Sequence, residues 1–554
     1  MKNTSKNSYL FLLVLFVVTA LLVGTPTYAQ DKTSEIDKIF SWATPATPGC
    51  AVAVSQNGKL VVNRAYGLAD LERNVPLSPD SVFDAASIRK QFVAAAVLLL
   101  VEEGRLSLSD DVRKFIPELP DYGHKITLDH MLTHTSGLRD WVPLRNWANG
   151  NYDVMTMILR QRGLNFAPGE EWSYSNSGYV LLAEIVARTS RMPFSEFARK
   201  RLFEPLGMKA TTFVDDLRQV VKNRALAYER EGNRWRMDML LDDRGGGAML
   251  STASDLVIWT DALTSARLGK FVSEKLQEPA TLNNGRKLSY ARGLGFTTNY
   301  AGRLVLHSGG AAGYRSILVR FPEQGLSIAV LCNAGEASDN RDEFAGRIFD
   351  LFMTDKGLRR PEPSAPPANA AGVDAADVNS KSGLFFSERT GEPLRLIANN
   401  GRLGIAGGGP LVAVSKDRFR NPRASMLFMS NDEFELNFLS PDQFELKSME
   451  GQTTRYRRAQ PYAPTAADLA AFAGRYESDE LRATFQMAPG KDGLMIRIND
   501  SPAPALEFRP VDRDTFQRGM MTMRFRRDQA GKVVGFDFSN PVLRNIKFTR
   551  LSDR

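Results

Sequence analysis

The chain has 554 residues, with 71 lysines and arginines against 63 aspartates and glutamates, and a formal net charge of +8 at pH 7. This length is too great for one hydrophobic core and is enough for about two to four domains. Both signs of charge are spread along the chain, which argues against a nucleic-acid-binding block, and 2 cysteines are too few to form a zinc site on their own.

The N-terminal residues have the pattern of a secretory signal. A lysine-bearing start leads into an apolar run, Leu10 to Val23, and a small-residue exit that ends at Ala29. This pattern predicts a signal peptide over residues 1–29. No cysteine follows the apolar run, and no later stretch is apolar enough to span a bilayer. We therefore expect a secreted or periplasmic protein that keeps no stable membrane anchor after the signal is removed.

Residues 30–356 mix helix and strand signals. CAVAVSQNGKLVVNRAYG, from Cys50, predicts a hairpin around the Asn57-Gly58 turn. The later patterns predict helices at 87–103, 176–189 and 194–205, then strands at 303–307, 314–321 and 326–332. Strands at both ends of this region, with helices between them, predict one sheet that the N-terminal hairpin completes.

The two cysteines lie at opposite ends of apolar strand-like runs. Cys50 begins the first run and Cys332 ends the last one. If these strands are antiparallel neighbours, the thiols are close and a structural disulfide can form in an oxidising compartment. Two buried free thiols are the alternative.

The C-terminal third differs in composition. Residues 357–381 are rich in Pro and Ala and predict a linker. Short alternating strands follow, and SGLFFSE, NNGRLGI, SKDRF and YRR recur in order, as AGRYESDE, KDGLMIRI, DRDTF and FTRL, roughly ninety residues later. The repeat predicts two small antiparallel β-barrel domains, 382–459 and 460–554, joined by the second linker AQPYAPTAADLAAF.

Ser87 and Lys90 stand where a buried helix begins, in the one S-x-x-K of the chain. At i and i+3 they share a helix face, so the amine reaches the serine Oγ. A serine hydroxyl is a weak nucleophile until a neighbour accepts its proton, and burial lowers a lysine's pKa toward that task. Read alone, the tetrapeptide also fits a helix-capping serine beside a solvated lysine.

Two further motifs add to this pair. Tyr174-Ser175-Asn176, the one Y-x-N of the chain, falls in a loop before another apolar helix, where a phenol can share a proton with Ser87 and Lys90. His307-Ser308-Gly309-Gly310 ends a strand, and glycines there let a substrate lie close to the backbone. A backbone N–H at this point, together with that of Ser87, would hold a developing oxyanion.

These motifs, in this order, resemble the serine beta-lactamase and penicillin-binding protein superfamily, whose signatures are S-x-x-K, Y-x-N or S-x-N, and K-T-G. ITLDHMLTHTSGL, PGEEWSYSNSGY, RLFEPLGM and HSGGAAGYRS extend the resemblance to the class C-related serine hydrolases, a branch that includes esterases and D-aminopeptidases. The resemblance covers roughly 35–355. It implies an α+β fold: a beta-lactamase-like domain, an antiparallel sheet flanked by helices, followed here by two lipocalin-like barrels.

The resemblance also implies a role for each matching residue. Ser87 is the acylated nucleophile, Lys90 orients and helps to deprotonate it, and Tyr174 is the partner base that later helps water to attack. Either Lys90 or Tyr174 takes the first proton. Asn176 and the His307 motif contact substrate, and the N–H groups of Ser87 and Gly310 form the oxyanion hole, beside Gly309. The family's fold also places the first strand beside the last, which makes a Cys50–Cys332 contact plausible.

Several other residues are expected to be structural. His134 to Gly137 is a family hallmark that we expect to organise a loop. Glu170 and Glu171 are expected to be solvated rather than hydrolytic. His124 and His130 stand apart from acidic or thiol partners. We therefore expect no metal and no cofactor.

The sequence departs from the beta-lactamases at His307, where those enzymes carry lysine. A largely neutral histidine attracts a substrate carboxylate poorly. The departure favours an exported serine hydrolase acting through an acyl-enzyme on small ester, amide or peptide substrates, similar to the esterases and D-aminopeptidases. Alternatives are a beta-lactamase or D-Ala-D-Ala carboxypeptidase, and a non-enzymatic envelope sensor whose barrels bind a ligand. The sequence leaves the oligomeric state open.

Overall fold

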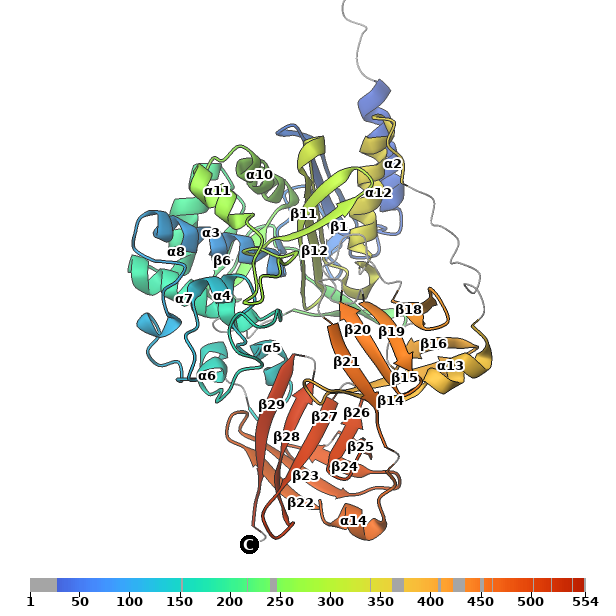
Figure 1. The fold of residues 1–554 in the computed structure, drawn as a ribbon. Coiled ribbons are helices and arrows are strands. Elements are labelled where there is room, and N and C mark those ends of the chain that lie inside the picture. Colours follow the sequence, from blue (N-terminus) through green and yellow to red (C-terminus); the bar gives the residue numbers. More distant parts are fainter. Residues whose placement is uncertain are drawn as a thin grey trace, which may run out of the picture.

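The structure, a computed structural model, describes residues 27–552 except 151–152, 217, 240–246, 339, 361–372, 407–409, 422–433, 449–452, 461, 502, 520 and 541. Most of the predicted signal peptide, residues 1–26, lies outside the described residues. Figure 1 shows a sheet with helices on both faces and, beside it, two β-domains formed by the C-terminal third of the chain. Within the described part of the chain, no helix has both the length and the apolar character that crossing a membrane requires.

The main sheet is antiparallel and contains both ends of the first domain, as the sequence predicts. Its order is β10-β11-β12-β13-β1-β2. The strands are β1 (Cys50–Gln56), β2 (Lys59–Tyr66), β10 (Gly295–Asn299), β11 (Gly302–Ala311), β12 (Tyr314–Phe321) and β13 (Leu326–Cys332). Because β1 and β13 are antiparallel neighbours, Cys50 pairs directly with Cys332, and the two are joined by a disulfide with a Cα–Cα distance of 4.0 Å.

Both faces of this sheet are buried, which explains why its central strands read as continuous apolar runs. On β1, Val52 and Val54 pack against α2 (Thr27–Ile39) and α12 (Arg341–Thr354), while Ala51 and Ala53 face the larger helical core on the opposite side. Helices α2 and α12 lie side by side on one face in Figure 1. This unit, from α2 to α12, is the first domain of the chain.

The remaining elements of this domain form the helical layer and three small sheets. The helices are α3 (Arg89–Glu102), α4 (Leu128–Leu132), α5 (Trp141–Arg145), α6 (Val154–Leu159), α7 (Asn176–Ser190), α8 (Phe194–Ala198), α9 (Glu204–Leu206), α10 (Ala253–Thr264) and α11 (Lys270–Leu276). The short strands are β3 (Leu68–Asp70), β4 (Val75–Pro76), β5 (Phe83–Asp84), β6 (Thr212–Val214), β7 (Tyr228–Glu231), β8 (Arg234–Met237) and β9 (Ala248–Ser251). The predicted helix 194–205 is divided, because the π-helical turn η3 (Arg199–Phe203) separates α8 from α9.

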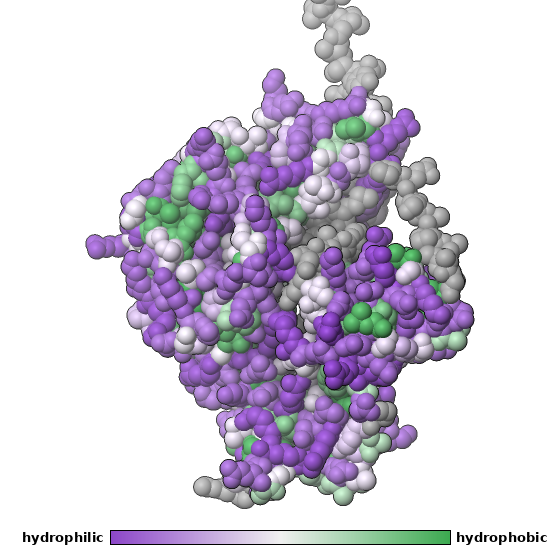
Figure 2. Space-filling model, viewed as in Figure 1, coloured by the Kyte–Doolittle hydropathy of each residue, from purple (hydrophilic) through white to green (hydrophobic). Residues whose placement is uncertain are grey.

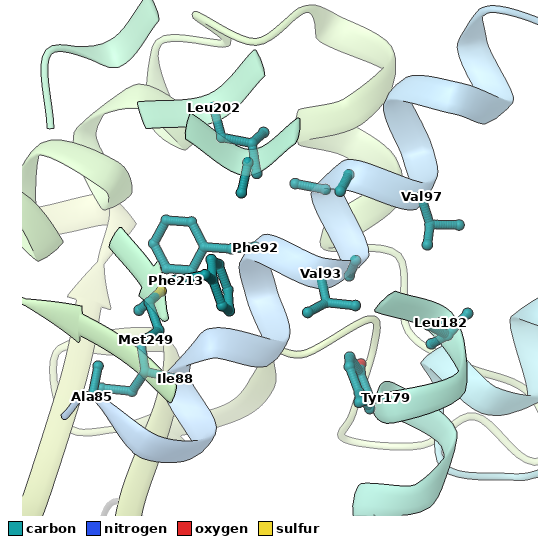
Figure 3. Close-up of a cluster of buried hydrophobic side chains, with 14 of the residues drawn as sticks. Ala85, Ile88, Phe92, Val93, Val97, Tyr179, Leu182, Leu202, Phe213 and Met249 are labelled. Carbon is teal, nitrogen blue, oxygen red and sulfur yellow. The ribbon is translucent and has the colours of Figure 1, made fainter. Parts of the chain in front are cut away.

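Helix α3 runs through the centre of the helical layer. The short 3₁₀ turn η1 (Ala86–Ile88) leads into it, and Gly104, at φ +71°, follows its C-terminus. Its side chains are buried all round, so α3 is held by packing rather than by an amphipathic stripe. Figure 3 shows its apolar side chains among those of the neighbouring elements, including Tyr179 and Leu182 of α7.

The C-terminal third forms two eight-stranded antiparallel units, as predicted. Barrel 1 contains β14 (Gly383–Ser387), β15 (Pro393–Asn399), β16 (Arg402–Ile405), β17 (Val412–Ala413), β18 (Arg418–Arg420), β19 (Phe434–Ser440), β20 (Gln443–Ser448) and β21 (Thr453–Arg458), with β16 and β17 at the two ends of its sheet. Barrel 2 is closed and contains β22 (Gly474–Ser478), β23 (Ala483–Pro489), β24 (Leu494–Ile498), β25 (Leu506–Pro510), β26 (Thr515–Arg518), β27 (Met521–Arg527), β28 (Val533–Asn540) and β29 (Leu543–Arg550).

The weak sequence repeat matches the strand order of the two barrels. Its four segments fall at or beside the first, third, fifth and last strand of each unit. Each barrel is also preceded by a short helix, α13 (Ala375–Lys381) or α14 (Ala466–Ala470). The end of the predicted 357–381 linker is therefore helical: Asp374 caps α13, and Val378 is buried in the core of barrel 1.

The face of the molecule in Figure 2 is mostly hydrophilic, with separate hydrophobic patches. Exposed large apolar side chains occur in all three units, for example Leu60 on β2, Leu439 on β19 and Val542 beside β29. Scattered exposure of this kind is normal for a folded domain and by itself marks no binding surface.

Candidate active site

Ser87 lies in a tight turn that packs against the end of β11. The preceding residue, Ala86, has φ +49°, a left-handed conformation that a non-glycine residue adopts only when its surroundings hold it there. A Cβ on Gly309 would lie 2.5 Å from the Ala85 carbonyl oxygen and 2.3 Å from Ser316 Oγ. Glycine is therefore required at 309 because β11 approaches the Ser87 turn so closely.

Lys90 lies one turn along the same helix face and is 1% exposed. Its Nζ lies 3.2 Å from Ser87 Oγ and donates a hydrogen bond to Asn176 Oδ1 at 2.7 Å. Asn176, the first residue of α7, donates in turn from Nδ2 to Asp140 Oδ2 at 2.9 Å. The Ser87 hydroxyl, the Lys90 amine, the Asn176 amide and the buried Asp140 carboxylate thus form one continuous hydrogen-bonded series.

Burial shifts the pKa values of Lys90 and Asp140, the two ionisable members of this hydrogen-bonded series. It lowers the pKa of Lys90 well below its usual value, the nearby positive charge of Arg89 lowers it further, and Asp140 opposes the shift. Burial also raises the pKa of Asp140, against the hydrogen bond from the Val142 N–H and the charge of Lys90. A lysine in this environment loses its proton more readily than a solvated one, and the neutral amine can accept a proton from Ser87.

Tyr174 faces the same point from the loop before α7. Lys90 Nζ lies 4.6 Å from the centre of its ring. Its Oη is buried and has no hydrogen-bond partner within normal distance among the described residues. Burial raises the pKa of Tyr174, although the Ser87 side chain opposes part of the rise. The phenol is therefore neutral at rest, and its orphaned hydroxyl has hydrogen-bonding capacity left for a substrate or a water molecule.

His307 takes part in a second hydrogen-bonded chain. His134 Nε2 lies 3.1 Å from Tyr290 Oη, which lies 3.2 Å from His307 Nε2. The ends fix the proton positions: Ser175 N–H donates to His134 Nδ1, and His307 Nδ1 donates to the Ser308 carbonyl oxygen. Tyr290 therefore accepts from His134 and donates to His307, so that both imidazoles are neutral and all four ring nitrogens are occupied.

The surroundings of His307 keep it uncharged. Burial, followed by the charge of Lys90, lowers the pKa of His307 to about 4. Burial and Lys90 likewise lower the pKa of His134 well below its usual value. His307, the side chain that β11 brings to this site, thus carries no positive charge near neutral pH.

With the geometry established, comparison with known proteins identifies the family. The Beta-lactamase family matches residues 40–351, more than half of the chain. This chain belongs to the Beta-lactamase family. It is a serine hydrolase related to the beta-lactamases, and its first domain has their α+β fold.

Three family relatives illustrate the match. The chain is 31% identical over 322 residues to Penicillin-binding protein 4* of Bacillus subtilis (strain 168), which covers 52% of this chain and 68% of that protein. The octameric penicillin-binding protein homologue from Pyrococcus abyssi has a TM-score of 0.51 at 22% identity, covering 77% of this chain and 99% of that one. The D-amino acid amidase from Ochrobactrum anthropi SV3 has a TM-score of 0.50 at 24% identity, covering 59% and 99%.

The curated relative and the two solved structures support different conclusions about this chain. The chain spans about two thirds of the length of the curated relatives that it matches. The two solved structures, both below 25% identity, show the shared Beta-lactamase fold alone. The roles of individual residues in this chain therefore depend on its own geometry.

The structure brings most of the predicted site residues together. Ser87, Lys90 and Asn176 are in direct contact, and the Tyr174 ring lies against Lys90. Gly309 is buried beneath the Ser87 turn, and its neighbour Gly310 is exposed at the end of β11. The loop from His134 to Gly137, predicted to be structural, carries the imidazole that bonds the Tyr174 loop.

The expectation for Glu171 is wrong. Glu170 is exposed, but Glu171 is only 8% exposed and pairs with Arg389 and Arg544. No local pattern predicts that arginines from the two barrels reach this position, because they lie 218 and 373 residues away in the chain.

Two polar members of the site were missed from the sequence. Asp140 lies three residues after Gly137 and caps α5, so an N-cap signal was present, but its bond to Asn176 depends on the fold. Tyr290 lies in a loop without a distinctive pattern, and only the structure shows that it joins His134 to His307.

Replacing Tyr290 by phenylalanine is expected to disturb both histidines. The change removes the one hydroxyl that satisfies two buried ring nitrogens, at a cost of about 1–3 kcal/mol in the free energy of unfolding. Nitrogen NMR should show the His307 ring as the Nδ1–H tautomer in the wild type and altered shifts for both rings in the variant. The control is Tyr300→Phe, whose hydroxyl donates to Asp350 at 2.6 Å in a more exposed setting. Equal destabilisation by both variants, with unchanged histidine shifts, would contradict the assignment.

Proposed function

We propose that this protein is an exported serine hydrolase that forms an acyl-enzyme on Ser87 and acts on small ester or amide substrates. The observation that carries the proposal is the buried contact of 3.2 Å between Lys90 Nζ and Ser87 Oγ. A lysine whose pKa is lowered by burial is a suitable base for a serine hydroxyl.

In the proposed acylation step, Ser87 Oγ attacks the substrate carbonyl carbon while Lys90 accepts the hydroxyl proton. The N–H groups of Ser87 and Gly310 stabilise the oxyanion of the tetrahedral intermediate. As this intermediate collapses, the bond to the leaving group breaks, and the alcohol or amine departs with a proton from Lys90 or Tyr174. The lowered pKa of the amine and the raised pKa of the phenol favour Lys90 as the first base.

In the proposed deacylation step, a water molecule attacks the ester bond to Ser87. The unpartnered hydroxyl of Tyr174 can bind this water, which gives a proton to Lys90 as its oxygen bonds to the acyl carbon. The bond between the acyl carbon and Ser87 Oγ then breaks, Lys90 returns the proton to Oγ, and the acid product leaves. The Oδ1 of Asn176 faces Lys90, so the amide fixes the amine in place while the reaction proceeds.

The substrate class follows from the wall at His307. Its imidazole is neutral, and both ring nitrogens already have partners, so it offers a substrate carboxylate neither charge nor a free donor. We therefore propose substrates that lack a carboxylate at this position, such as esters and amino acid amides. One protein of similar fold is named a D-amino acid amidase, which is compatible with amide substrates.

The other candidate functions have less support. A beta-lactamase or D-Ala-D-Ala carboxypeptidase would need a cation near the substrate carboxylate, and His307 supplies none. A sensor that binds a ligand within its barrels would need interior space, but barrel 2 is filled by clustered aromatic side chains, among them Phe485, Phe536 and Phe548.

A substrate panel tests the proposal. The purified chain is treated with a fluorophosphonate, and mass spectrometry should locate the adduct on Ser87. An untreated portion of the same preparation is assayed on p-nitrophenyl esters, D-amino acid amides and nitrocefin. Ester or amide turnover well above nitrocefin turnover supports the proposal, whereas dominant nitrocefin hydrolysis would move the assignment to the beta-lactamases. An adduct on another serine would remove the mechanism.

A further inference from the structure

Glu171 lies where the first domain (α2 to α12), which we call the hydrolase domain, contacts both barrels. Arg544 of barrel 2 donates to its carboxylate with both terminal nitrogens, at 3.1 and 3.0 Å. Arg389 of barrel 1 donates to the same carboxylate at 2.6 Å. Burial acts to raise the pKa of Glu171, but the hydrogen bonds from these arginines outweigh it and keep the pKa below its usual value. An ionised carboxylate is thus shared by three domains.

The two arginines are themselves fixed by their barrels. Arg389 lies in the connection between β14 and β15, where the Gly391 carbonyl accepts a hydrogen bond of 2.7 Å from Arg524 of barrel 2. Arg544 lies on β29, and its backbone N–H donates to Asn165 Oδ1 at 2.9 Å. In Figure 1, β28 and β29 of barrel 2 lie beneath α5 and α6 of the hydrolase domain. The position of Glu171 therefore depends on where the two barrels place these arginines.

Glu171 precedes Tyr174 by three residues, and the segment from Gly169 to Ser173 forms hydrogen bonds on its other side. Gly169 N–H donates to the Thr135 carbonyl at 2.8 Å, and Ser173 N–H donates to the His134 carbonyl at 2.9 Å. This segment is held between the His134 loop on one side and the two barrels on the other. The direction of the Tyr174 side chain thus depends on contacts outside the hydrolase domain.

The opposite side of the site is joined to barrel 2 in a similar way. Arg139 is 4% exposed, forms an ion pair with Glu480, and donates to the carbonyl oxygens of Arg544 and Asn545. The next residue, Asp140, holds Asn176. Both the tyrosine and the carboxylate that aligns Asn176 are thus adjacent to buried charged contacts with barrel 2.

We propose that Glu171 is a positioning residue through which the two barrels hold Tyr174 in its reactive place, so that barrels distant in sequence take part in catalysis. This inference depends on the proposed serine hydrolase function. Glu171 is the buried member of this cluster, whereas Arg544 is partly buried and Arg389 is half exposed. Removing the charge of Glu171 leaves both arginines without their shared partner, so the loop is expected to shift. A misplacement of about 1 Å costs up to roughly a hundredfold in rate.

The test compares two variants of the full-length chain. Glu171→Gln keeps the shape of the side chain and removes the charge that both arginines contact. Asp479→Asn removes a different ion pair between the same hydrolase domain and barrel 2, the exposed contact of 2.9 Å with Arg160. Glu171→Gln is expected to lower kcat for a p-nitrophenyl ester by roughly tenfold to a hundredfold with little change in KM. The rate of fluorophosphonate labelling should also fall in Glu171→Gln. Asp479→Asn should change neither kcat nor the labelling rate.

Three outcomes would overturn the inference: an unchanged kcat in Glu171→Gln, a rise in KM alone, or an equal loss of kcat in Asp479→Asn. If Glu171→Gln fails to fold, Arg544→Lys decides, because it keeps the charge but loses the paired geometry and should lower kcat by a smaller factor. An Arg544→Lys chain with wild-type kcat rejects the inference. Failure of the proposed function gives a different result, because the wild-type chain itself would then not be labelled at Ser87.

Discussion

Replacing Ser87 by alanine is expected to abolish fluorophosphonate labelling and to reduce ester hydrolysis by a factor on the order of 10⁵ to 10⁶, as removal of the nucleophile does in other serine hydrolases. The site has no substitute, because Lys90 and Asn176 are bonded to each other and Tyr174 is neutral. Labelling is read by in-gel fluorescence, and turnover by release of p-nitrophenol.

The control is Ser327→Ala, which removes another buried serine hydroxyl, on β13, whose partner is Asp261 at 3.3 Å. This variant should be labelled like the wild type. The Ser87→Ala chain should keep the thermal stability of the wild type, because the turn around Ser87 is held by Ala85, Ala86 and Gly309 rather than by the hydroxyl. Persistent turnover in a folded Ser87→Ala chain would mean that another group performs the chemistry.

The sequence was sufficient to predict the parts of this fold that depend on local pattern. Asn57 and Gly58, both at positive φ, form the expected hairpin turn. The hairpin also joins the sheet of the last strands as expected, although its place beside β13 was implied by the family resemblance rather than by the apolar runs. The barrel repeat was readable because equivalent strands keep similar residues around their turns. The S-x-x-K spacing fixed the Ser87–Lys90 contact, since a helical turn brings i and i+3 together whatever the tertiary fold.

The sequence was insufficient where a contact joins distant segments with common residue types. Nothing about Glu171 distinguishes it from Glu170, yet one is buried against Arg389 and Arg544 and its neighbour is exposed. The same holds for Tyr290, whose role depends on two histidines that approach it from other segments. Such contacts leave no local periodicity, so only the fold reveals them.

Replacing Lys90 by methionine is expected to lower kcat/KM by roughly 10² to 10⁴, the usual contribution of a positioned general base. Methionine fills a similar volume without an amine, so Ser87 loses its proton acceptor and Asn176 Oδ1 loses its donor. The matched control is Lys381→Met, since Lys381 is also buried, at 4% exposed, but pairs with Asp417 in barrel 1. That variant should keep wild-type kcat/KM.

The pH profile makes this prediction specific to the amine. In the wild type the pKa of Lys90 is lowered, so kcat/KM should rise with pH as the amine becomes neutral and should fall as acid protonates it. His307, with a pKa of about 4, remains in both proteins and cannot account for a limb that disappears with Lys90. Lys90→Met should therefore retain a small activity without the acid limb of the wild type. If the variant keeps that limb, or if Lys381→Met loses as much activity, Lys90 is not the base that activates Ser87.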